Sequence, residues 1–211
     1  DIKRVVGYRQ FCNKIWNAIK FALTYVGDFT PSPDMALEVI NAGADASRRD
    51  LCILSKLNTL VENVEKKMTA YVFGDVVQDL YSFFMNDFCD VYLELVKPVV
   101  NDNSEANAPA RRRVQITLYH CLETFLRLIH PMMPFVTEEL FHRLPGHAQR
   151  MAAAKQAKDP RLATGSIMVQ PFPETEASSK WINQAAEADM HTIHVRPKPT
   201  PPIFIHFQPC M

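Results

Sequence analysis

Residues 8–26, YRQFCNKIWNAIKFALTYV, have the apolar spacing of a long packed helix. With about 100° of rotation per residue, the apolar side chains of this stretch gather on one side. They are Phe11, Cys12, Ile15, Trp16, Ile19, Ala22, Leu23 and Val26. An apolar arc of this width is wider than a coiled-coil seam, and it is typical of a helix that packs into the core of a globular protein.

The opposite side of this helix is expected to be a polar surface that contains one aromatic ring. Its members are Gln10, Asn13, Lys14, Asn17, Lys20 and Phe21, and Lys3 shares the azimuth of Phe21 if the helix begins that early. In single-stranded RNA, bases stack on aromatic rings, phosphates contact lysines and amides bond base edges. This face is therefore a candidate RNA-binding surface. The alternative is that Phe21 packs under a neighbouring helix or loop, since bundle helices often bury more than one face.

The remaining apolar periodicity predicts an all-α fold, a helical bundle of four long helices plus short helices, with a partly irregular C-terminal segment. Long helices are expected at residues 3–26, 48–72, 75–96 and 110–129, and short ones at 34–41 and 134–144. Pro98 is expected to close the third long helix and Pro131 to follow the end of the fourth.

We expect three regions along the chain. Residues 1–144 form the bundle, and residues 145–190 hold a basic mobile loop, an extended segment at 167–173 and a short helix within 180–190. Two prolines confine the extended segment to an edge or to a draped position. Residues 191–211 are Pro-rich, lack a helical period and are expected to be irregular.

The composition limits the possible partners and the compartment. The formal charge is +0, so net charge gives no argument for nucleic acid, and only local patches such as Arg111–Arg113 and residues 143–161 are basic. No apolar run approaches the roughly 20 residues that a membrane-spanning helix needs. Five scattered cysteines favour reduced thiols and a cytoplasmic location. The absence of an initiator Met suggests a fragment of a longer protein.

The sequence offers no convincing catalytic or metal site. Glu139 and His142 have the spacing of one half of a di-iron site, but the chain contains no second Glu-x-x-His step, so a surface-exposed helix end is the simpler interpretation. There is no Gly-x-Ser-x-Gly elbow and no Gly-rich phosphate loop. We therefore expect no catalytic residue and no bound metal in this chain.

Four segments resemble, in order and spacing, the anticodon-binding helical domain of class I aminoacyl-tRNA synthetases, and most closely that of the valine enzymes. They are YRQFCNKIWNA at residues 8–18, FCDVYLELVKP at 88–98, HPMMPFVTEELF at 130–141 and SIMVQPFP at 166–173. The third segment is shared by the valine, isoleucine and leucine enzymes, whereas the first two point to valine. The resemblance implies that the domain recognises the anticodon stem-loop of a tRNA, chiefly through its first helix.

That resemblance assigns roles to the polar face of the first helix. Phe21 would stack on an unpaired anticodon base, while Lys14 and Lys20 would contact phosphates or base acceptors. Asn13 or Asn17 would hydrogen-bond to a base edge. The two open alternatives are the equivalent domain of an isoleucine enzyme and a helical protein-interaction module that does not bind RNA.

Further expectations concern the parent enzyme. Lys3 would reach the backbone of the loop or stem, and Arg111–Arg113 would add phosphate contacts. The resemblance implies ATP and magnesium as cofactors of the parent and its catalytic domain as a partner, with no cofactor in this chain and no DNA or membrane partner. The His-Ile-Gly-His-like and Lys-Met-Ser-Lys-Ser-like motifs of class I enzymes do not occur here, so this chain alone is expected to be inactive.

The chain departs from the family pattern in two places. At residues 50–55, DLCILS stands where the family usually has DRWILS, which puts the local packing in question. After Met190 the family continues with a helix rich in Ile and Arg, and this chain does not. One hypothesis for this tail is an altered reading frame or a mis-predicted exon.

Overall fold

Helices make up most of the chain that the computed structural model describes, namely residues 2–27, 29–32, 35–42, 47–156, 165–174 and 183–188. Their order is α1 (Ile2–Val26), α2 (Met35–Ile40), α3 (Arg48–Thr69), α4 (Phe73–Ser82), η2 (Phe83–Tyr92), α5 (Leu93–Asn101), η3 (Glu105–Asn107), α6 (Ala108–Ile129), α7 (Pro134–Arg143), α8 (His147–Gln156) and η5 (Ile167–Val169). No strand occurs in these residues. The all-α prediction with four long helices is confirmed.

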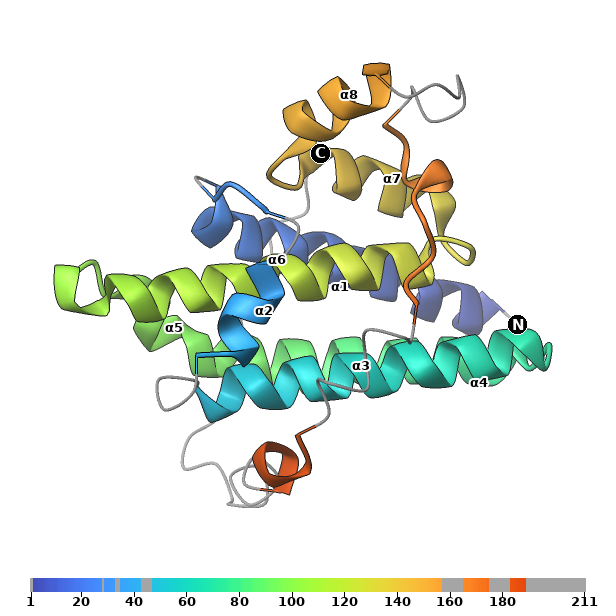
Figure 1. Ribbon diagram of the computed structural model, residues 1–211. Helices are drawn as coiled ribbons and strands as arrows, with labels where there is room; N and C mark the ends of the chain where they lie inside the picture. The colour runs from blue at the N-terminus through green and yellow to red at the C-terminus, as the bar shows by residue number, and fades with distance from the viewer. Residues whose placement is uncertain are drawn as a thin grey trace.

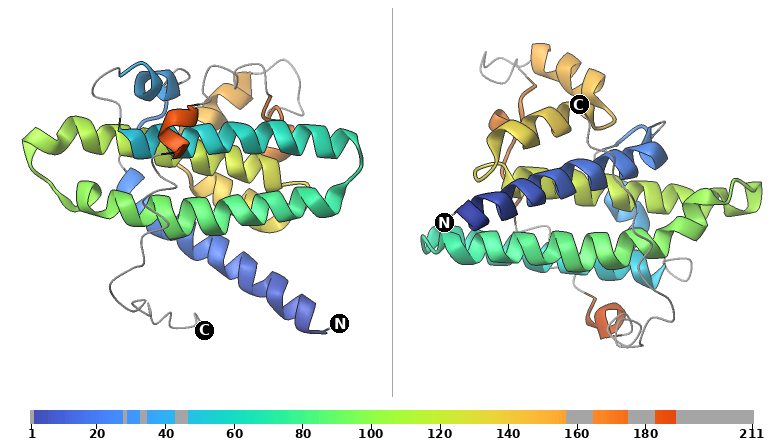
Figure 2. Two further views of the ribbon diagram at one scale, coloured as in Figure 1. Left: turned by 90° about the horizontal axis from the view of Figure 1, so that it is seen from below. Right: turned by 180° about the vertical axis from the view of Figure 1, so that it is seen from behind.

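The long helices are arranged as a layer that α1 crosses. α3, α6 and the continuous helix formed by α4, η2 and α5 run lengthwise beside one another, and α1 lies diagonally against α6 on one side (Figures 1 and 2). α2 packs against α6 from the other side, and α7 runs back over the C-terminal half of α6 with α8 packed against it (Figure 1). One face of α1 is thereby left without a covering helix (Figure 2).

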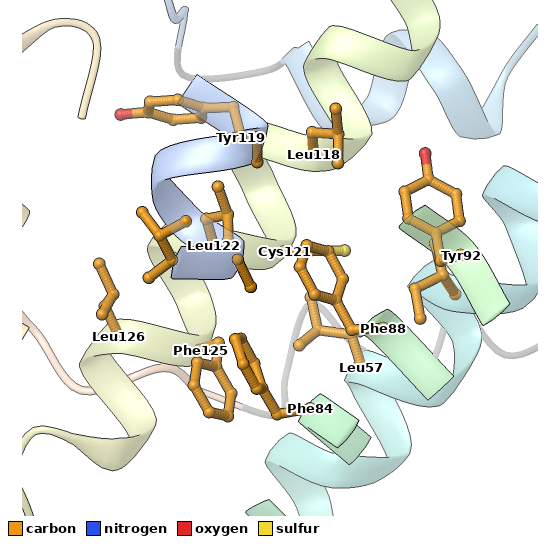
Figure 3. Packing of buried hydrophobic residues seen from close by; sticks show 14 of the residues in the cluster. Leu57, Phe84, Phe88, Tyr92, Leu118, Tyr119, Cys121, Leu122, Phe125 and Leu126 are labelled. Carbon is orange, nitrogen blue, oxygen red and sulfur yellow. The ribbon is translucent and has the colours of Figure 1, made fainter. Parts of the chain in front are cut away.

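Aromatic side chains form the centre of the core. Phe84 of η2 and Phe125 of α6 stack with ring centroids 4.5 Å apart, and Phe88 continues the stack 5.6 Å from Phe84 (Figure 3). Phe11 of α1 meets Phe84 edge-on at 6.2 Å. Stacked and edge-on pairs at such distances are worth roughly 0.5–1.5 kcal/mol beyond the area they bury. These contacts fix α1 to the layer through its apolar arc.

The third long helix is longer than predicted. It runs without a break from Phe73 to Asn101, its central part η2 is π-helical, and it continues through Pro98. A proline inside a helix removes one backbone hydrogen bond and crowds the preceding turn. The turn after Pro98 is nevertheless held in place, because Val100 is buried in the core and Asn101 accepts a hydrogen bond from the Tyr25 hydroxyl. The predicted end at Val96 is therefore wrong.

The prediction of a mobile loop after α7 is also wrong for residues 147–156, because these residues form the helix α8. The guanidinium of Arg150 explains its position, since it donates hydrogen bonds to the Tyr119 hydroxyl and to the carbonyls of Phe141 and Pro145. It also lies 4.6 Å from the centre of the Phe141 ring. The remainder of that predicted loop, residues 157–164, lies outside the described residues.

The segment at 165–174 lies along the surface of the bundle, and the predicted extended conformation applies only to the residues after η5. It contains the short turn η5 and continues without regular structure to residue 174. Ile167 is buried in the core, while the Ser166 hydroxyl and the Ile167 amide donate to the carboxylate of Glu138. A helical turn at 184–188 lies within the predicted last helix, and the predicted irregular tail, 191–211, lies outside the described residues.

A buried carboxyl group sits at the altered 50–55 segment. The Tyr92 hydroxyl donates a 2.8 Å hydrogen bond to Oδ1 of Asp50, and both side chains are almost fully buried. Burial raises the pKa of Asp50, against the opposing influence of the Arg49 guanidinium and the Tyr92 hydrogen bond. An ionised carboxylate at this position is therefore disfavoured by the fold.

We predict that Asp50→Asn is at least as stable as the wild type at pH 7, because the amide still accepts from Tyr92 without carrying a charge. A raised folded-state pKa contributes stability that is complete below the unfolded pKa, about 3.9, and is lost as the pH rises through the folded pKa. The advantage of the Asn variant should thus shrink between pH 7 and pH 4 in urea unfolding. Asp50→Leu should lose about 1–3 kcal/mol, since the buried Tyr92 hydroxyl loses the carboxylate to which it donates.

Candidate RNA-binding surface

The apolar arc of α1 faces the core and its flanks touch two other helices. Ile15 and Ile19 are fully buried. On one flank Lys14 lies near Cys89 of η2, where the ammonium lowers the thiol pKa, although burial is the larger influence and raises that pKa to about 12. On the other flank the Arg143 guanidinium of α7 lies 5.0 Å from the Trp16 ring centre. Between the flanks runs the uncovered face of α1.

The predicted site residues differ in their exposure. Asn13 and Lys20 are exposed on the uncovered face, while Lys14 and Asn17 are half-buried at its edge. Lys3 lies within α1, but its side chain is outside the described residues. The helix therefore brings Asn13, Asn17 and Lys20 to one side, with Lys14 turned towards η2.

Phe21 is not the exposed ring of the RNA-binding prediction, and the alternative of packing beside a neighbouring helix holds for part of the ring. It is half-buried and packs against the core, with the Tyr25 ring edge-on at 5.1 Å and the Lys97 ammonium 5.7 Å from its centre. Lys97 also forms an ion pair with Glu94. The reason is the length of the third helix: because α5 continues past Pro98, its last turns lie along the flank of α1. The remaining exposed part of the ring borders the polar face.

The charges of α1 are the clearest functional feature of the surface. Between Ile2 and Val26 the sequence has no Asp or Glu but five basic residues, in a chain whose formal charge is +0. They are Lys3, Arg4, Arg9, Lys14 and Lys20. Among the described side chains, no carboxylate lies within ion-pair distance of Arg9, Lys14 or Lys20. Eight Lys and Arg side chains of other helices are paired with carboxylates, namely Arg49, Lys56, Lys66, Lys67, Lys97, Arg112, Arg127 and Arg143.

The sequence-based prediction omits Arg9, which is exposed, and it gives no weight to the missing carboxylates. The overall charge hides this feature, because the other parts of the chain carry five more acidic than basic residues. Counting charges helix by helix would have found it. The contact of Lys97 with Phe21 is missed for a different reason, since the two residues lie far apart in the sequence.

Arg111–Arg113 are not brought together with the face of α1. Arg111 donates to the carbonyl of Asp102, and Arg112 pairs with Glu38 of α2 and lies 5.9 Å from the ring centre of Phe29. α2 and α1 lie on opposite sides of α6 (Figures 1 and 2). These contacts engage Arg111 and Arg112 within the protein.

The two residues with di-iron spacing also have separate partners. The Glu139 carboxylate accepts from Arg143, whereas His142 contacts Glu138 through Nε2 and His147 through Nδ1. Within the described part of the chain, no three His, Cys, Asp or Glu side chains are grouped as metal ligands. No described helix is long and apolar enough to cross a membrane.

A hollow of about 400 Å³ lies on another part of the surface, between α3, η2 and the turn at 184–188. Its charged groups are balanced, with Lys56 paired to Asp87, and Glu187 accepting from the hydroxyl of Ser55. It lacks the excess of unpaired cations that distinguishes α1.

Comparison with known proteins decides the family. The family described as "Anticodon-binding domain of tRNA ligase" matches residues 50–195, more than half of the chain. The chain belongs to this anticodon-binding domain family. It is 43% identical over 189 residues to valine–tRNA ligase of Homo sapiens, and 38% identical over 194 residues to mitochondrial valine–tRNA ligase 1 of Arabidopsis thaliana. A bacterial relative, valine–tRNA ligase of Psychrobacter arcticus, is 36% identical over 193 residues.

These alignments cover 89% to 92% of this chain but only 13% to 18% of each relative. The resemblance derived from the four segments is confirmed, and the isoleucine and protein-interaction alternatives are not favoured. The matched range of the family begins at residue 50, so α1 lies before it. The roles of the individual α1 residues stay predictions.

We predict that Phe21→Ala lowers the stability of the anticodon-binding domain by about 1–2 kcal/mol, roughly half the value for a fully buried side chain truncated in a core. Phe21→Leu, which keeps most of the apolar contact with Tyr25, should lose less than about 1 kcal/mol. Urea unfolding of the three proteins measures this. A loss of about 3 kcal/mol or more for Phe21→Leu would show that the ring is a core residue with no exposed part to offer a ligand.

Proposed function

We propose that this domain binds the anticodon stem-loop of a valine tRNA through the uncovered face of α1. The observation that carries the proposal is a helix with five cations and no carboxylate, whose described cations are unpaired while eight Lys and Arg side chains of other helices are paired with carboxylates. Unpaired cations attract a phosphate backbone, because contact with it releases condensed counter-ions. The family and the valine–tRNA ligase relatives support the choice of a tRNA.

Each predicted residue has a place in this proposal. The exposed Lys20 and the half-buried Lys14 contact phosphates, while Asn13 and Asn17 bond base edges. The exposed part of the Phe21 ring stacks on one unpaired base. Its packing against Tyr25 and Lys97 supports this role, since a ring already held in place loses little conformational freedom on binding.

Lys3 lies 18 residues before Phe21, which is about 27 Å along a straight helix. It therefore contacts another part of the same RNA, on the backbone of the loop or stem. In this proposal, valine activation with ATP and magnesium belongs to a catalytic domain outside the present sequence, and the domain itself holds no cofactor. The four described cysteines are free thiols, which suits a reducing compartment, and we assign the domain to the cytosol.

The first test is the salt dependence of binding. We expect the affinity for a valine anticodon stem-loop to fall steeply with salt, and Lys20→Gln to lower the log–log slope by about 0.7–0.9 per lost phosphate contact. The matched control is Lys66→Gln, which removes another exposed cation, one that is paired with Glu62 on α3. Fluorescence anisotropy between 50 and roughly 300 mM salt measures both. Equal slopes for the two variants would exclude Lys20 from phosphate contact.

The second test concerns the stacked base. Phe21→Leu should weaken binding of the valine stem-loop about 5- to 100-fold, as expected for the loss of one stacked base. An isoleucine anticodon stem-loop measured beside it tests the choice of amino acid. Equal affinity of the wild type for both RNAs would remove the valine assignment, and no measurable binding to either would overturn the proposed function.

A further inference from the structure

A groove runs beside the N-terminal half of α1, between that helix, the third long helix and the junction of α6 with α7. Its volume is about 1000 Å³. It is lined by Gly7, Gln10, Phe11, Lys14, Val77, Leu80, Tyr81, Met85, Ile129, Pro131, Met132 and Met133. Sites for small organic ligands occupy roughly 300–1000 Å³ and combine an apolar floor with a few polar groups. This groove has that composition.

Tyr81 is the aromatic side chain of the groove that remains accessible. It is 42% exposed, and its ring lies 4.9 Å from that of Phe11 at an angle of 48°. Within the described part of the chain its hydroxyl has no hydrogen-bond partner. An exposed ring supported from below by a second ring is a suitable platform for a planar, aromatic ligand.

The polar groups of the groove belong to the uncovered face of α1. Gln10 is exposed, and Lys14 is one of the unpaired cations of this face of α1. The groove therefore opens directly onto the surface to which we assign RNA binding. No carboxylate lines the groove. A negatively charged ligand therefore meets no repulsion there, and the amide of Gln10 has both a donor and an acceptor for a base edge.

We propose that this groove receives a second unpaired nucleobase of the RNA bound by α1, with Tyr81 as its stacking partner. The amide of Gln10 bonds the edge of the base and the ammonium of Lys14 contacts its phosphate. The inference rests on the proposed function and extends it to α4. Lys14 and Phe21 are two helical turns apart, about 10 Å, so the nucleotide in the groove differs from the one on Phe21.

A segment of protein is the competing occupant, since Met132, Met133 and Met85 would suit an apolar side chain. The single lysine, the absence of carboxylates and the continuity with the cationic face favour the nucleobase. The two occupants differ in one measurable respect: only a nucleobase makes Tyr81 sensitive to the identity of one RNA position.

The test pairs protein variants with a set of RNAs. Tyr81→Leu keeps an apolar side chain but removes the ring, and Phe73→Leu is the matched control, because Phe73 lies on the same helix, is 48% exposed and does not line the groove. Each protein is titrated, as the full 211-residue chain, with the wild-type stem-loop and with RNAs that carry one abasic nucleotide at each loop position in turn. Thermal unfolding checks that each variant is folded, and Tyr81→Phe should restore binding.

We expect Tyr81→Leu to weaken binding about 5- to 100-fold, with Phe73→Leu unchanged. The RNA that is abasic at one particular loop position should bind the wild type and Tyr81→Leu with equal affinity, because the base that stacks on Tyr81 is already missing. The same comparison of affinities for Phe21→Leu should identify a different loop position. Additive losses at every position, or wild-type affinity for Tyr81→Leu, would overturn the groove assignment while leaving the proposed function in place. Absence of RNA binding by the wild type would overturn both.

Discussion

The stack of Phe84 on Phe125 is the contact on which the arrangement of this domain depends. It joins the third long helix to α6, and Phe11 packs on its edge, so the same aromatic group also fixes α1. Once the apolar arc of α1 is bound in this way, its opposite face has to remain on the surface. The position of the proposed RNA site is therefore a direct consequence of core packing, and a helix with hydrophobic residues all round would have left no such face.

Much of this fold follows from periodicity in the sequence. The apolar arc of α1 predicts both its length and the side that it buries, and the fold class follows from the repetition of such arcs in three further helices. The sequence fails where packing between distant segments overrides a local signal. Pro98 is a reasonable end for an isolated helix, but burial of Val100 keeps the chain helical. Arg150 similarly holds α8 through carbonyls and a hydroxyl that sequence spacing does not reveal.

The errors at the candidate site follow from those errors in the fold. A helix that ended before Pro98 would not bring Asn101 to Tyr25, the neighbour of Phe21, so the sequence alone leaves open whether that ring is exposed or packed. The charge feature could have been recognised from the sequence, because it requires only that the basic and acidic residues be assigned to their helices. The groove beside Tyr81 could not, since its lining comes from three separate parts of the chain.

The separation of charge in this domain has an effect before any contact is made. In a chain of zero formal charge, α1 with its five cations and no carboxylate concentrates positive charge on one helix. In the field of an approaching polyanion such a molecule rotates, so that encounters with α1 in front become more frequent than random orientation allows. The charge of α1 thus raises the rate of association with RNA, because it orients the protein once the two molecules are within about one Debye length of each other. It also strengthens the final contacts.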